Sequence, residues 1–404
     1  MACLIMWNGL RRTMVNVAFF PPTSRAWMGG ANYYKNLFFA ISEHGSKCGI
    51  RAVSFVGKNT SRDLIDECYV RSKVVRSSLF DRRSFLWFCS KVFSRVLGYD
   101  PLLHILMLRY GVRVVSHATP LLPKSFFKIG WIPDFQHAHL PGFFSPNEIA
   151  SRDRLFNTIA ANSDLVFLSS NDAFDHYKRF FPPELHYKAR VLRFVSQVDV
   201  RYFEFDGLVL ASLVEKYGVK EKFIYIPNQF WKHKNHIAVL RAAKILRDKG
   251  VNFCFVFTGH KHDYRAPGLY GSLDEYVLNN GLSDNVFFLG SVPYYDVMAL
   301  LRFSVAVVNP SLFEGWSSTV EECKSAGKRM ILSDIPVHRE QCPNALFFDS
   351  DSPEQLARLI ESIPLCDTGV CMDSIVLDNK IRTEEYFYAF CSSINSLVKD
   401  QEKI

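Results

Sequence analysis

The sequence lacks the features of a membrane-spanning helix and of a signal peptide. No stretch approaches the roughly 18 uninterrupted apolar residues of a membrane-spanning helix. Near the amino end, Arg11 and Arg12 follow a short apolar run, whereas a signal peptide carries its positive charges before that run. We therefore expect neither secretion nor a membrane span, and we expect a cytoplasmic location.

Patterns that hold disulfides, dinucleotides or metal ions are also missing. The ten cysteines are scattered without a Cys-x-x-Cys pair, which favours reduced thiols in the core of a cytosolic protein. There is no Gly-x-Gly-x-x-Gly, so a dinucleotide cofactor is not indicated. One Asp-x-Asp occurs, at Asp349 and Asp351, and it follows a strand in a surface-type turn. We expect no cofactor and no metal site.

What the chain does contain is an ordinary globular composition with an uneven distribution of charge. Of its 404 residues, 48% are apolar and 22% are charged. Residues 1–200 hold 26 Lys and Arg against 14 Asp and Glu, whereas residues 201–404 hold 22 against 26. This length favours two or more domains. The charge difference predicts different partners for the two halves, with the basic half facing something anionic.

Short apolar runs alternate with amphipathic stretches, as in parallel sheets covered by helices on both faces. The runs lie at 15–20, 49–57, 111–118, 128–135, 164–170, 190–196, 222–227, 252–259, 285–290, 304–311 and 329–334. Between 60 and 110 we expect a mainly helical insert. We predict an α/β protein with two Rossmann-like doubly wound domains, 1–200 and 201–382. The two are expected to face a cleft at the carboxyl ends of their sheets, and a terminal helix, 383–404, is expected to pack back on the first domain.

The most informative segment is 309–340, where a buried strand leads through a turn into a helix. Glu314 and Gly315 occupy the turn, and the helix is expected to begin near Ser317–Thr319. Free N–H groups at such a helix start suit a phosphate. Glu314 and Glu322 place two carboxylates at one junction, where they could grip vicinal sugar hydroxyls. From spacing alone, they could equally be a dipole-stabilising acid and a solvated acid.

This segment resembles the signature of the GT-B-fold retaining glycosyltransferases of glycosyltransferase family 4, of the group 1 type. In that signature a second Glu follows the first after seven residues, as Glu322 follows Glu314. The accompanying small residues are Gly315, Ala326 and Gly327. The resemblance implies that Glu314 contacts the transferred sugar and that Glu322 holds the nucleotide ribose. The neighbouring Glu321 leaves open which acid faces the ribose.

Two further segments resemble parts of the family's donor site. In the family, an Arg and a Lys six residues later neutralise the donor pyrophosphate. Lys234 stands at the Lys position, whereas Asn228 stands where the Arg belongs, and Lys232 is a candidate to compensate. Gly29 and Gly30 follow the first strand, where the resemblance implies that a glycine pair closes over the diphosphate. A plain tight turn is the alternative interpretation.

Candidate catalytic groups follow the strand predicted at 128–135. Many family members place a His or an acid here, near the sugar or the acceptor hydroxyl. We rank His137 first and Asp134 second, beside Glu314, although a loop histidine can be merely structural. The predicted donor-binding residues are Glu322, Lys234, Asn228, Gly29, Gly30, Gly315, Trp316, Ser317, Ser318 and Thr319.

The insert at 69–99 is both basic and aromatic. Against the single Asp81 it holds Arg71, Lys73, Arg76, Arg82, Arg83, Lys91 and Arg95, interleaved with Phe80, Phe85, Trp87, Phe88 and Phe93. This combination is typical of an interfacial helix on an anionic membrane, and a basic surface around an ordinary core helix is the alternative. We predict contact with the inner face of the plasma membrane through 71–95. No recognition motif for nucleic acid is present, so we expect no such partner.

The resemblance implies transfer of a hexose-type sugar, with retention and without an obligatory metal. The second domain would bind a nucleotide-sugar donor, and the first would bind a glycan or lipid-linked acceptor. Assembly of surface polysaccharide or lipopolysaccharide is the expected setting. Two alternatives stay open. One is a non-catalytic nucleotide-sugar-binding subunit, which the departure at Asn228 favours, and the other is a sugar-nucleotide epimerase on the same fold.

Overall fold

A computed structural model describes residues 14–23, 28–364 and 372–401. Contacts divide the chain into two compact units. Unit 1 comprises the described residues within Met1–Trp131, Thr158–Phe167 and Thr383–Ile404, and unit 2 comprises Ile132–Asn157 and Leu168–Arg382. The predicted domain boundary at residue 200 stays a prediction.

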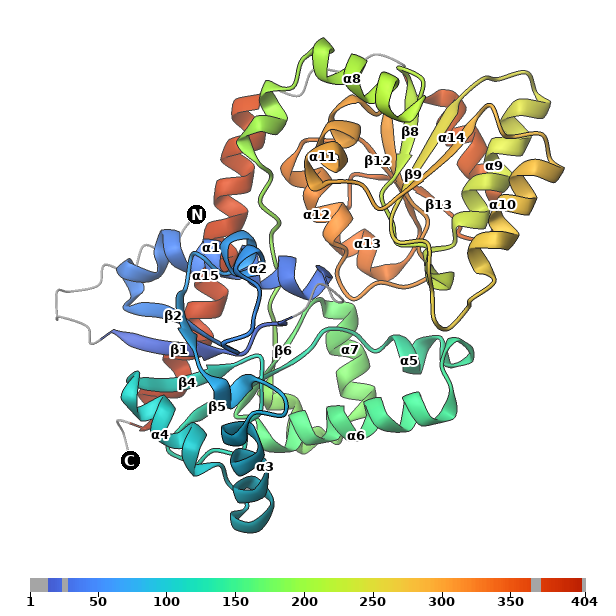
Figure 1. Cartoon of the computed structure of the whole chain (residues 1–404). Helices are drawn as coiled ribbons and strands as arrows, with labels where there is room; N and C mark the ends of the chain where they lie inside the picture. Colours follow the sequence, from blue (N-terminus) through green and yellow to red (C-terminus); the bar gives the residue numbers. More distant parts are fainter. Residues whose placement is uncertain (1–13, 24–27, 365–371, 402–404) are drawn as a thin grey trace. The chain divides into compact units, whose positions relative to one another are not determined.

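A seven-stranded sheet, in the order β3-β2-β1-β4-β5-β6-β7, is built by the first half of the chain (Figure 1). Its strands are β1 Val15–Phe19, β2 Ile50–Val56, β3 Lys73–Arg76, β4 Val112–Ser116, β5 Phe127–Ile132, β6 Leu165–Leu168 and β7 Ala189–Val191. Strand β1 pairs in parallel with β2 and β4, and Val17, Ala18 and Phe19 are fully buried. Burial on both faces is what the apolar runs of a parallel sheet predict.

Helices from both ends of the described chain contribute to the core of unit 1. Helix α1 (Met28–Cys48) follows β1, and helix α15 (Met372–Gln401) ends the described chain. The ring of Phe19 on β1 lies 5.1 Å from that of Phe38 on α1 and 6.2 Å from that of Phe390 on α15, between ring centroids. Neither α15 nor any other helix in the described part of the chain is long and apolar enough to cross a membrane.

The insert between 60 and 110 differs from the prediction. It contains the helices α2 (Arg62–Cys68), α3 (Phe85–Leu97) and α4 (Pro101–Arg109), but it also contains the edge strand β3. The mainly helical prediction missed β3 because its apolar part is a single pair, Val74 and Val75, between two charged residues. The basic residues of β3 therefore lie on a sheet edge and not on an amphipathic helix.

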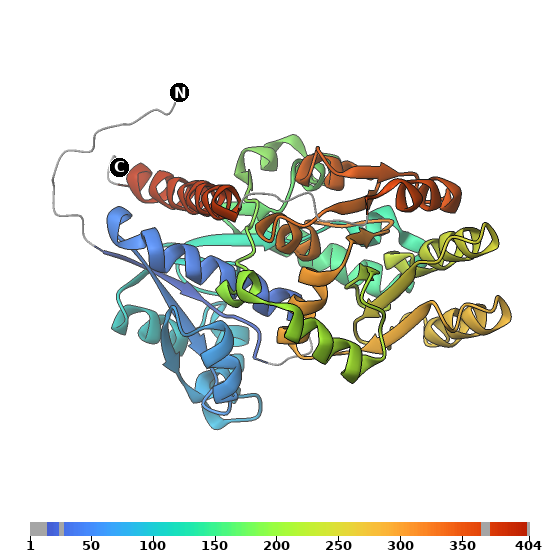
Figure 2. The same cartoon turned by 90° about the horizontal axis from the view of Figure 1, so that it is seen from above.

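The six-stranded sheet of unit 2 has the order β10-β9-β8-β11-β12-β13 (Figure 1 and Figure 2). Its strands are β8 Phe223–Ile226, β9 Cys254–Thr258, β10 Val286–Gly290, β11 Ala306–Asn309, β12 Met330–Ser333 and β13 Leu346–Phe348. Every pair of neighbouring strands is parallel. β8 and β11 are the two middle strands, so the segments that follow them open at the centre of one sheet edge.

Alternate residues of β8 enter different cores, as the two-residue period of a strand requires. Ile224 and Ile226 pack with α9 (His236–Asp248), α10 (Leu269–Asn279) and α14 (Pro353–Ser362). Phe223 and Tyr225 pack with α8 (Gly207–Tyr217), α11 (Tyr294–Phe303) and α12 (Ser318–Ser325). Helices thus cover both faces of the sheet, which confirms the predicted doubly wound α/β class.

A carboxylate in α13 (Pro336–Gln341) fixes the start of α7 (Asn171–Phe180) within unit 2. Glu340 accepts hydrogen bonds from the Asn171 N–H at 2.9 Å and from the Arg193 guanidinium at 2.7 Å. Glu340→Ala is expected to lower the free energy of unfolding by about 1–2 kcal/mol, because helix N–H groups lose an anionic partner. Urea unfolding measures this change. Glu361→Ala, which breaks an exposed pair with Lys249, is the control and should change it by less than about 1 kcal/mol.

Candidate functional site

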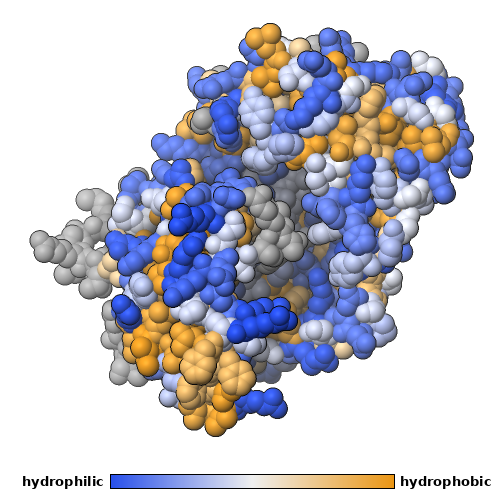
Figure 3. Space-filling model, viewed as in Figure 1, coloured by the Kyte–Doolittle hydropathy of each residue, from blue (hydrophilic) through white to orange (hydrophobic). Residues whose placement is uncertain are grey.

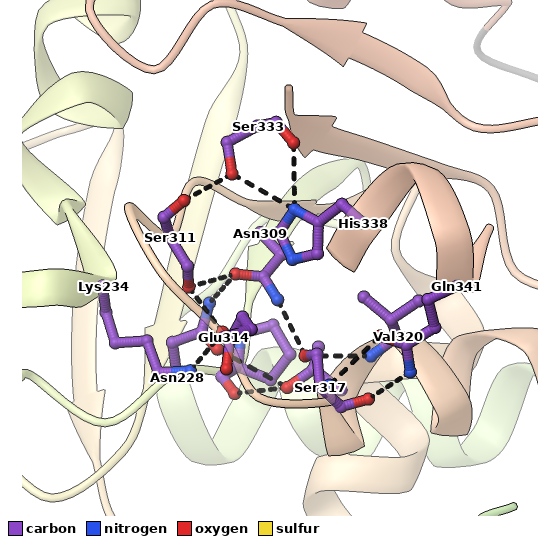
Figure 4. Close-up of polar contacts among 12 residues, drawn as sticks. Asn228, Lys234, Asn309, Ser311, Glu314, Ser317, Val320, Ser333, His338 and Gln341 are labelled. Carbon is purple, nitrogen blue, oxygen red and sulfur yellow. Dashed lines mark hydrogen bonds and ion pairs between the residues drawn. The ribbon is translucent and has the colours of Figure 1, made fainter. Parts of the chain in front are cut away.

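Two buried asparagines join the segments after β8 and β11. Asn228 follows β8 and Asn309 ends β11. The Asn228 side-chain amide donates to Asn309 Oδ1 at 3.3 Å, and the Asn309 amide donates to Ser317 Oγ at 3.0 Å (Figure 4). The side chain of Asn228, a predicted donor-binding residue at the position where the family has an Arg, is therefore tied to the neighbouring turn.

A buried ion pair lies beside these asparagines. Lys234 Nζ lies 2.5 Å from Glu314 Oε1, and the two side chains are 13% and 10% exposed. Ser311 Oγ lies within hydrogen-bonding distance of the same Oε1, at 2.7 Å (Figure 4). Burial is the largest single effect and acts to raise the pKa of Glu314, but the combined electrostatic effects of Lys234, His338 and His233, with the hydrogen bond from Lys234, lower this pKa to about 2. Glu314 is therefore an ionised carboxylate throughout the physiological pH range.

Two neutral imidazoles flank the ion pair. His338 is fully buried, and its Nδ1 lies 2.9 Å from the Ser333 carbonyl oxygen, to which it donates when protonated. Its Nε2 then meets no hydrogen-bond partner among the described residues. Burial lowers the pKa of His338. Burial, with a smaller effect from the charge of Lys234, also lowers the pKa of His233, to about 3. Neither imidazole therefore adds a positive charge beside Lys234 at neutral pH.

Helix α12 begins at the same place, with its first turn held by side chains. Ser317 is the N-cap, and its Oγ accepts from the Val320 N–H at 3.4 Å. Gln341 bonds both the N–H and the carbonyl of Ser317, at 3.1 and 2.8 Å. Within the described ranges no acceptor meets the N–H of Ser318 or Thr319. These two N–H groups are the unsatisfied donors that every helix start leaves open.

The two neighbouring acids of α12 have different surroundings. Glu321 is 1% exposed, and it is held by Arg382 at 2.7 Å and by Lys324 at 3.2 Å. Glu322 is half-buried. Burial raises the pKa of the Tyr225 phenol near the end of β8, and the negative charge of Glu322 raises it further. Glu321 is therefore held in a buried ion-pair network, and the contact of Glu322 with the nucleotide ribose stays a prediction.

Gly315 lies where the turn after β11 meets the segment 132–157. A Cβ at this position would lie 2.3 Å from the Pro133 carbonyl oxygen and 2.9 Å from Asp134 Cβ. Asp134 therefore lies directly against the turn that carries Glu314. Its carboxylate accepts from the Gln136 N–H at 2.9 Å and from Arg152 at 3.3 Å. The structure thus brings one predicted catalytic residue, Asp134, beside another.

His137 lies in a closed environment. It is 1% exposed, and its Nε2 lies 3.0 Å from Asp153 Oδ1. The rings that surround it belong to Phe144, Phe156 and Phe180. Burial lowers the pKa of His137, and its Nδ1 meets no partner in the part of the chain that the structure describes. Its imidazole is buried among these rings, and its catalytic role stays a prediction.

The remaining predicted residues lie in several places. Trp316 donates from Nε1 to the Phe194 carbonyl at 3.0 Å. The ammonium of Lys232 lies 4.5 Å from the Phe143 ring centroid, over a hollow of about 380 Å³. Gly29 and Gly30 belong to unit 1, where they form part of the first turn of α1 and not a separate turn before it.

Several residues of this site were not predicted. Asn309, Ser311, His338 and Gln341 complete the polar cluster in Figure 4. The sequence signal for two of them is a short polar residue at or just after the end of a buried strand, as with Asn309 and Ser311. A separate feature lies in unit 1, where His117 follows β4 with a backbone φ of 62° and its Nε2 lies 2.6 Å from Tyr33 Oη. Positive φ at a non-glycine strand end is a feature that clusters at functional sites.

The same part of unit 2 carries the match to known proteins. Residues 213–367 match the family model of the glycosyl transferases group 1. The predicted resemblance to group 1 glycosyltransferases is confirmed for this segment, which includes Lys234, Glu314 and Glu322. Membership of glycosyltransferase family 4 stays a prediction.

Individual relatives cover the group 1 segment or share the fold. The O-antigen chain mannosyltransferase RfbU of Salmonella typhimurium is 28% identical over 145 residues, 36% of this chain and 39% of that protein. EpsF of Bacillus subtilis is 31% identical over 149 residues, 36% of this chain and 37% of EpsF. The chain thus spans well under half the length of each relative. Anabaena HepE, solved with UDP and glucose, has a TM-score of 0.64 at 13% identity and covers 97% of this chain and 100% of HepE. The fold is GT-B, as predicted.

Proposed function

We propose that the protein transfers a hexose-type sugar from a nucleotide-sugar donor to a glycan or lipid-linked acceptor in surface polysaccharide or lipopolysaccharide assembly. The transfer would retain the anomeric configuration and need neither a metal nor a cofactor. The observation that carries the proposal is the buried Lys234–Glu314 pair at the centre of the sheet edge, inside a group 1 segment. The names of RfbU, an O-antigen mannosyltransferase, and of HepE, solved with UDP and glucose, support it.

Charge stabilisation is the chemistry that this cluster suits. When the bond between the anomeric carbon and the phosphate oxygen breaks, negative charge develops on the leaving diphosphate. The Lys234 ammonium and the open N–H groups of Ser318 and Thr319 are donors fixed before the reaction, and such donors are typically worth about 3 kcal/mol each. A diphosphate that binds Lys234 releases Glu314, whose carboxylate can then accept hydrogen bonds from sugar hydroxyls.

The acceptor side of the reaction needs a proton acceptor. The acceptor oxygen forms a new bond to the anomeric carbon, and its proton must leave. Asp134 is the candidate that the geometry favours over His137, because it lies against Gly315 whereas His137 is buried among phenylalanine rings. We place this step at the cytoplasmic face of the plasma membrane, where a lipid-linked acceptor would be found.

The two acids of α12 provide a matched pair of variants. Glu322→Gln is expected to weaken donor binding at least tenfold while it changes the free energy of unfolding by less than about 1 kcal/mol, since charged hydrogen bonds to a ligand are typically worth about 1.5–3 kcal/mol. Glu321→Gln is expected to cost stability instead, about 3 kcal/mol, because it leaves Arg382 without its buried partner. Calorimetric titration and urea unfolding measure the two effects. If instead Glu321→Gln weakens donor binding and Glu322→Gln lowers stability, the ribose contact belongs to Glu321.

A donor panel tests the activity itself. Purified protein should show a raised melting temperature with one of the UDP-, GDP- or ADP-sugars, because binding to the folded state adds stability by mass action. Slow hydrolysis of that donor should follow, and Glu314→Gln should reduce it at least 100-fold. Binding without hydrolysis or transfer would instead identify a nucleotide-sugar-binding subunit. Isomerisation of the donor without an acceptor would identify an epimerase.

A further inference from the structure

Helix α3 in unit 1 turns an apolar stripe towards solvent. Phe85, Phe88, Val92 and Val96 follow one another at intervals of three, four and four residues, which is one face of a helix. Phe85 is 79% exposed and Val96 74%, and Phe88 and Val92 are exposed as well. Over the 13 residues of α3 the stripe is about 20 Å long. Such a continuous apolar face on a water-exposed helix marks an interaction surface.

The apolar surface continues from α3 onto the next elements. Ile105 and Leu108 on α4 are exposed, while Leu103 and Met107 on the same helix are buried. Leu121 is also exposed, and its carbonyl accepts from the Asp100 N–H at 2.8 Å, which fixes its loop to the start of α4. Figure 3 shows hydrophobic residues, in orange, gathered where Figure 1 draws α3 and α4. We call the surface formed by these exposed residues of α3, α4 and Leu121 the apolar face.

The segment that carries the apolar face is rich in bases and poor in acids. Between residues 82 and 133 the sequence has one acid, Asp100. Its eight bases are Arg82, Arg83, Lys91, Arg95, Arg109, Arg113, Lys124 and Lys128. The single acid does not offset them at the surface. Asp100 is 5% exposed, and its carboxylate accepts from the Ser90 hydroxyl and from the Leu103 N–H.

A hollow of about 370 Å³ opens beside the apolar face, and its charged lining residues are Lys91, Arg95 and the buried Asp100. Lys91 and Arg95 lie one helical turn apart on α3, and Ser94, Leu103, Pro120 and Leu121 complete the lining. Both cations are exposed. A cationic hollow next to an apolar surface has the two parts that an anionic phospholipid needs, a site for the phosphate and a contact for the acyl chain.

We propose that the apolar face inserts into the interface of an anionic lipid membrane, with Lys91 and Arg95 binding a lipid phosphate. The charge pattern separates this partner from a second copy of the chain. A twofold dimer brings the same residues of both copies together, so the cations beside the apolar face would meet one another without carboxylates between them. An anionic bilayer instead supplies both the apolar medium and the opposite charge. The proposal is independent of the sugar chemistry, because all of its residues lie in unit 1.

Sedimentation with vesicles tests this surface. The full chain should sediment with vesicles of phosphatidylcholine and phosphatidylglycerol at 7:3 and much less with pure phosphatidylcholine. Lys91→Gln with Arg95→Gln should lower the partition coefficient about 25-fold, since each cation near an anionic surface is worth about fivefold. Phe85→Ser with Phe88→Ser and Val96→Ser should abolish sedimentation with both vesicle types.

Matched controls change equally exposed residues of unit 2. Leu208→Ser with Leu278→Ser and Tyr187→Ser removes three exposed apolar groups, and Lys220→Gln with Lys222→Gln removes two exposed cations. Both should sediment like the parent protein, and thermal melting should show that every variant is folded. The proposal is overturned if the parent protein does not sediment with the anionic vesicles or if the apolar triple variant still sediments with them. It is equally overturned if the triple substitution only converts a dimer into monomers.

Discussion

Replacing Lys234 by methionine is expected to lower the free energy of unfolding at pH 7 by about 3–5 kcal/mol. The substitution keeps the length of the side chain but leaves Glu314 as a buried carboxylate without its cation, and that is the cost of removing one partner of a buried pair. The double variant Lys234→Met with Glu314→Gln should recover much of the loss, because it leaves no unpaired charge. Urea unfolding of both variants measures the coupling between the two residues.

The pH dependence of this loss gives a second readout. In the parent protein the pKa of Glu314 is lowered to about 2, so the pair contributes stability above the ordinary carboxyl pKa and loses it as the pH falls towards 2. Without Lys234, burial dominates and the pKa of Glu314 rises above its ordinary value of 4.5. The stability gap between parent and Lys234→Met should therefore narrow from pH 7 to pH 5. A gap of constant size, or a double variant no more stable than the single one, would contradict the assignment. Lys249→Met, at an exposed pair, is the control.

Alanine at position 315 is expected to destabilise the protein by about 2 kcal/mol and to reduce sugar transfer about 100-fold. The added Cβ would lie 2.3 Å from the Pro133 carbonyl oxygen, so backbone must move, and overpacking of this kind typically costs 1–3 kcal/mol. The movement displaces Asp134 from the turn that carries Glu314, and a shift of about 1 Å at a reacting centre is worth about 100-fold in rate.

The control for this variant lies in the same segment. A Cβ at Gly142 meets no atom within 4 Å, and the residue does not need positive φ. Gly142→Ala should therefore leave the melting temperature unchanged and the rate of donor hydrolysis within about twofold of that of the parent protein. If Gly315→Ala also leaves the melting temperature and donor hydrolysis unchanged, the close approach between residues 133–134 and the turn after β11 is not needed for function.

Much of unit 2 could be predicted from the sequence because its strands are apolar throughout and its helices are amphipathic. The position of Glu314 followed from that rhythm, since a residue between a strand and a helix must lie at a sheet edge. Its partner could not be predicted in the same way, because Lys234 is 80 residues away and only the folded sheet brings the two together. The roles of Glu321 and Glu322 were ambiguous for the same reason, as Arg382 lies 61 residues from Glu321.

Two other features could not be predicted from the periodicity of apolar residues. Strand β3 carries only two apolar residues, so hydrogen bonding to β2 and not composition defines it. His137 lies in a short helix of four residues, Gln136–His139, where spacing says nothing about which way a ring points. Its burial is decided by aromatic residues from α6 (Pro146–Asn162) and α7.

The Lys234–Glu314 pair also bears on how a finished nucleotide would leave the site. On the proposed function, an intact donor offers a diphosphate to Lys234 and sugar hydroxyls to Glu314, so both halves of the pair exchange one partner for another. A nucleoside diphosphate offers only the first, and by taking Lys234 it leaves Glu314 buried and alone. On this proposal the spent nucleotide would bind less tightly than the donor, because its departure lets the ion pair form again. The ion pair would then favour product release and limit inhibition by accumulated nucleotide.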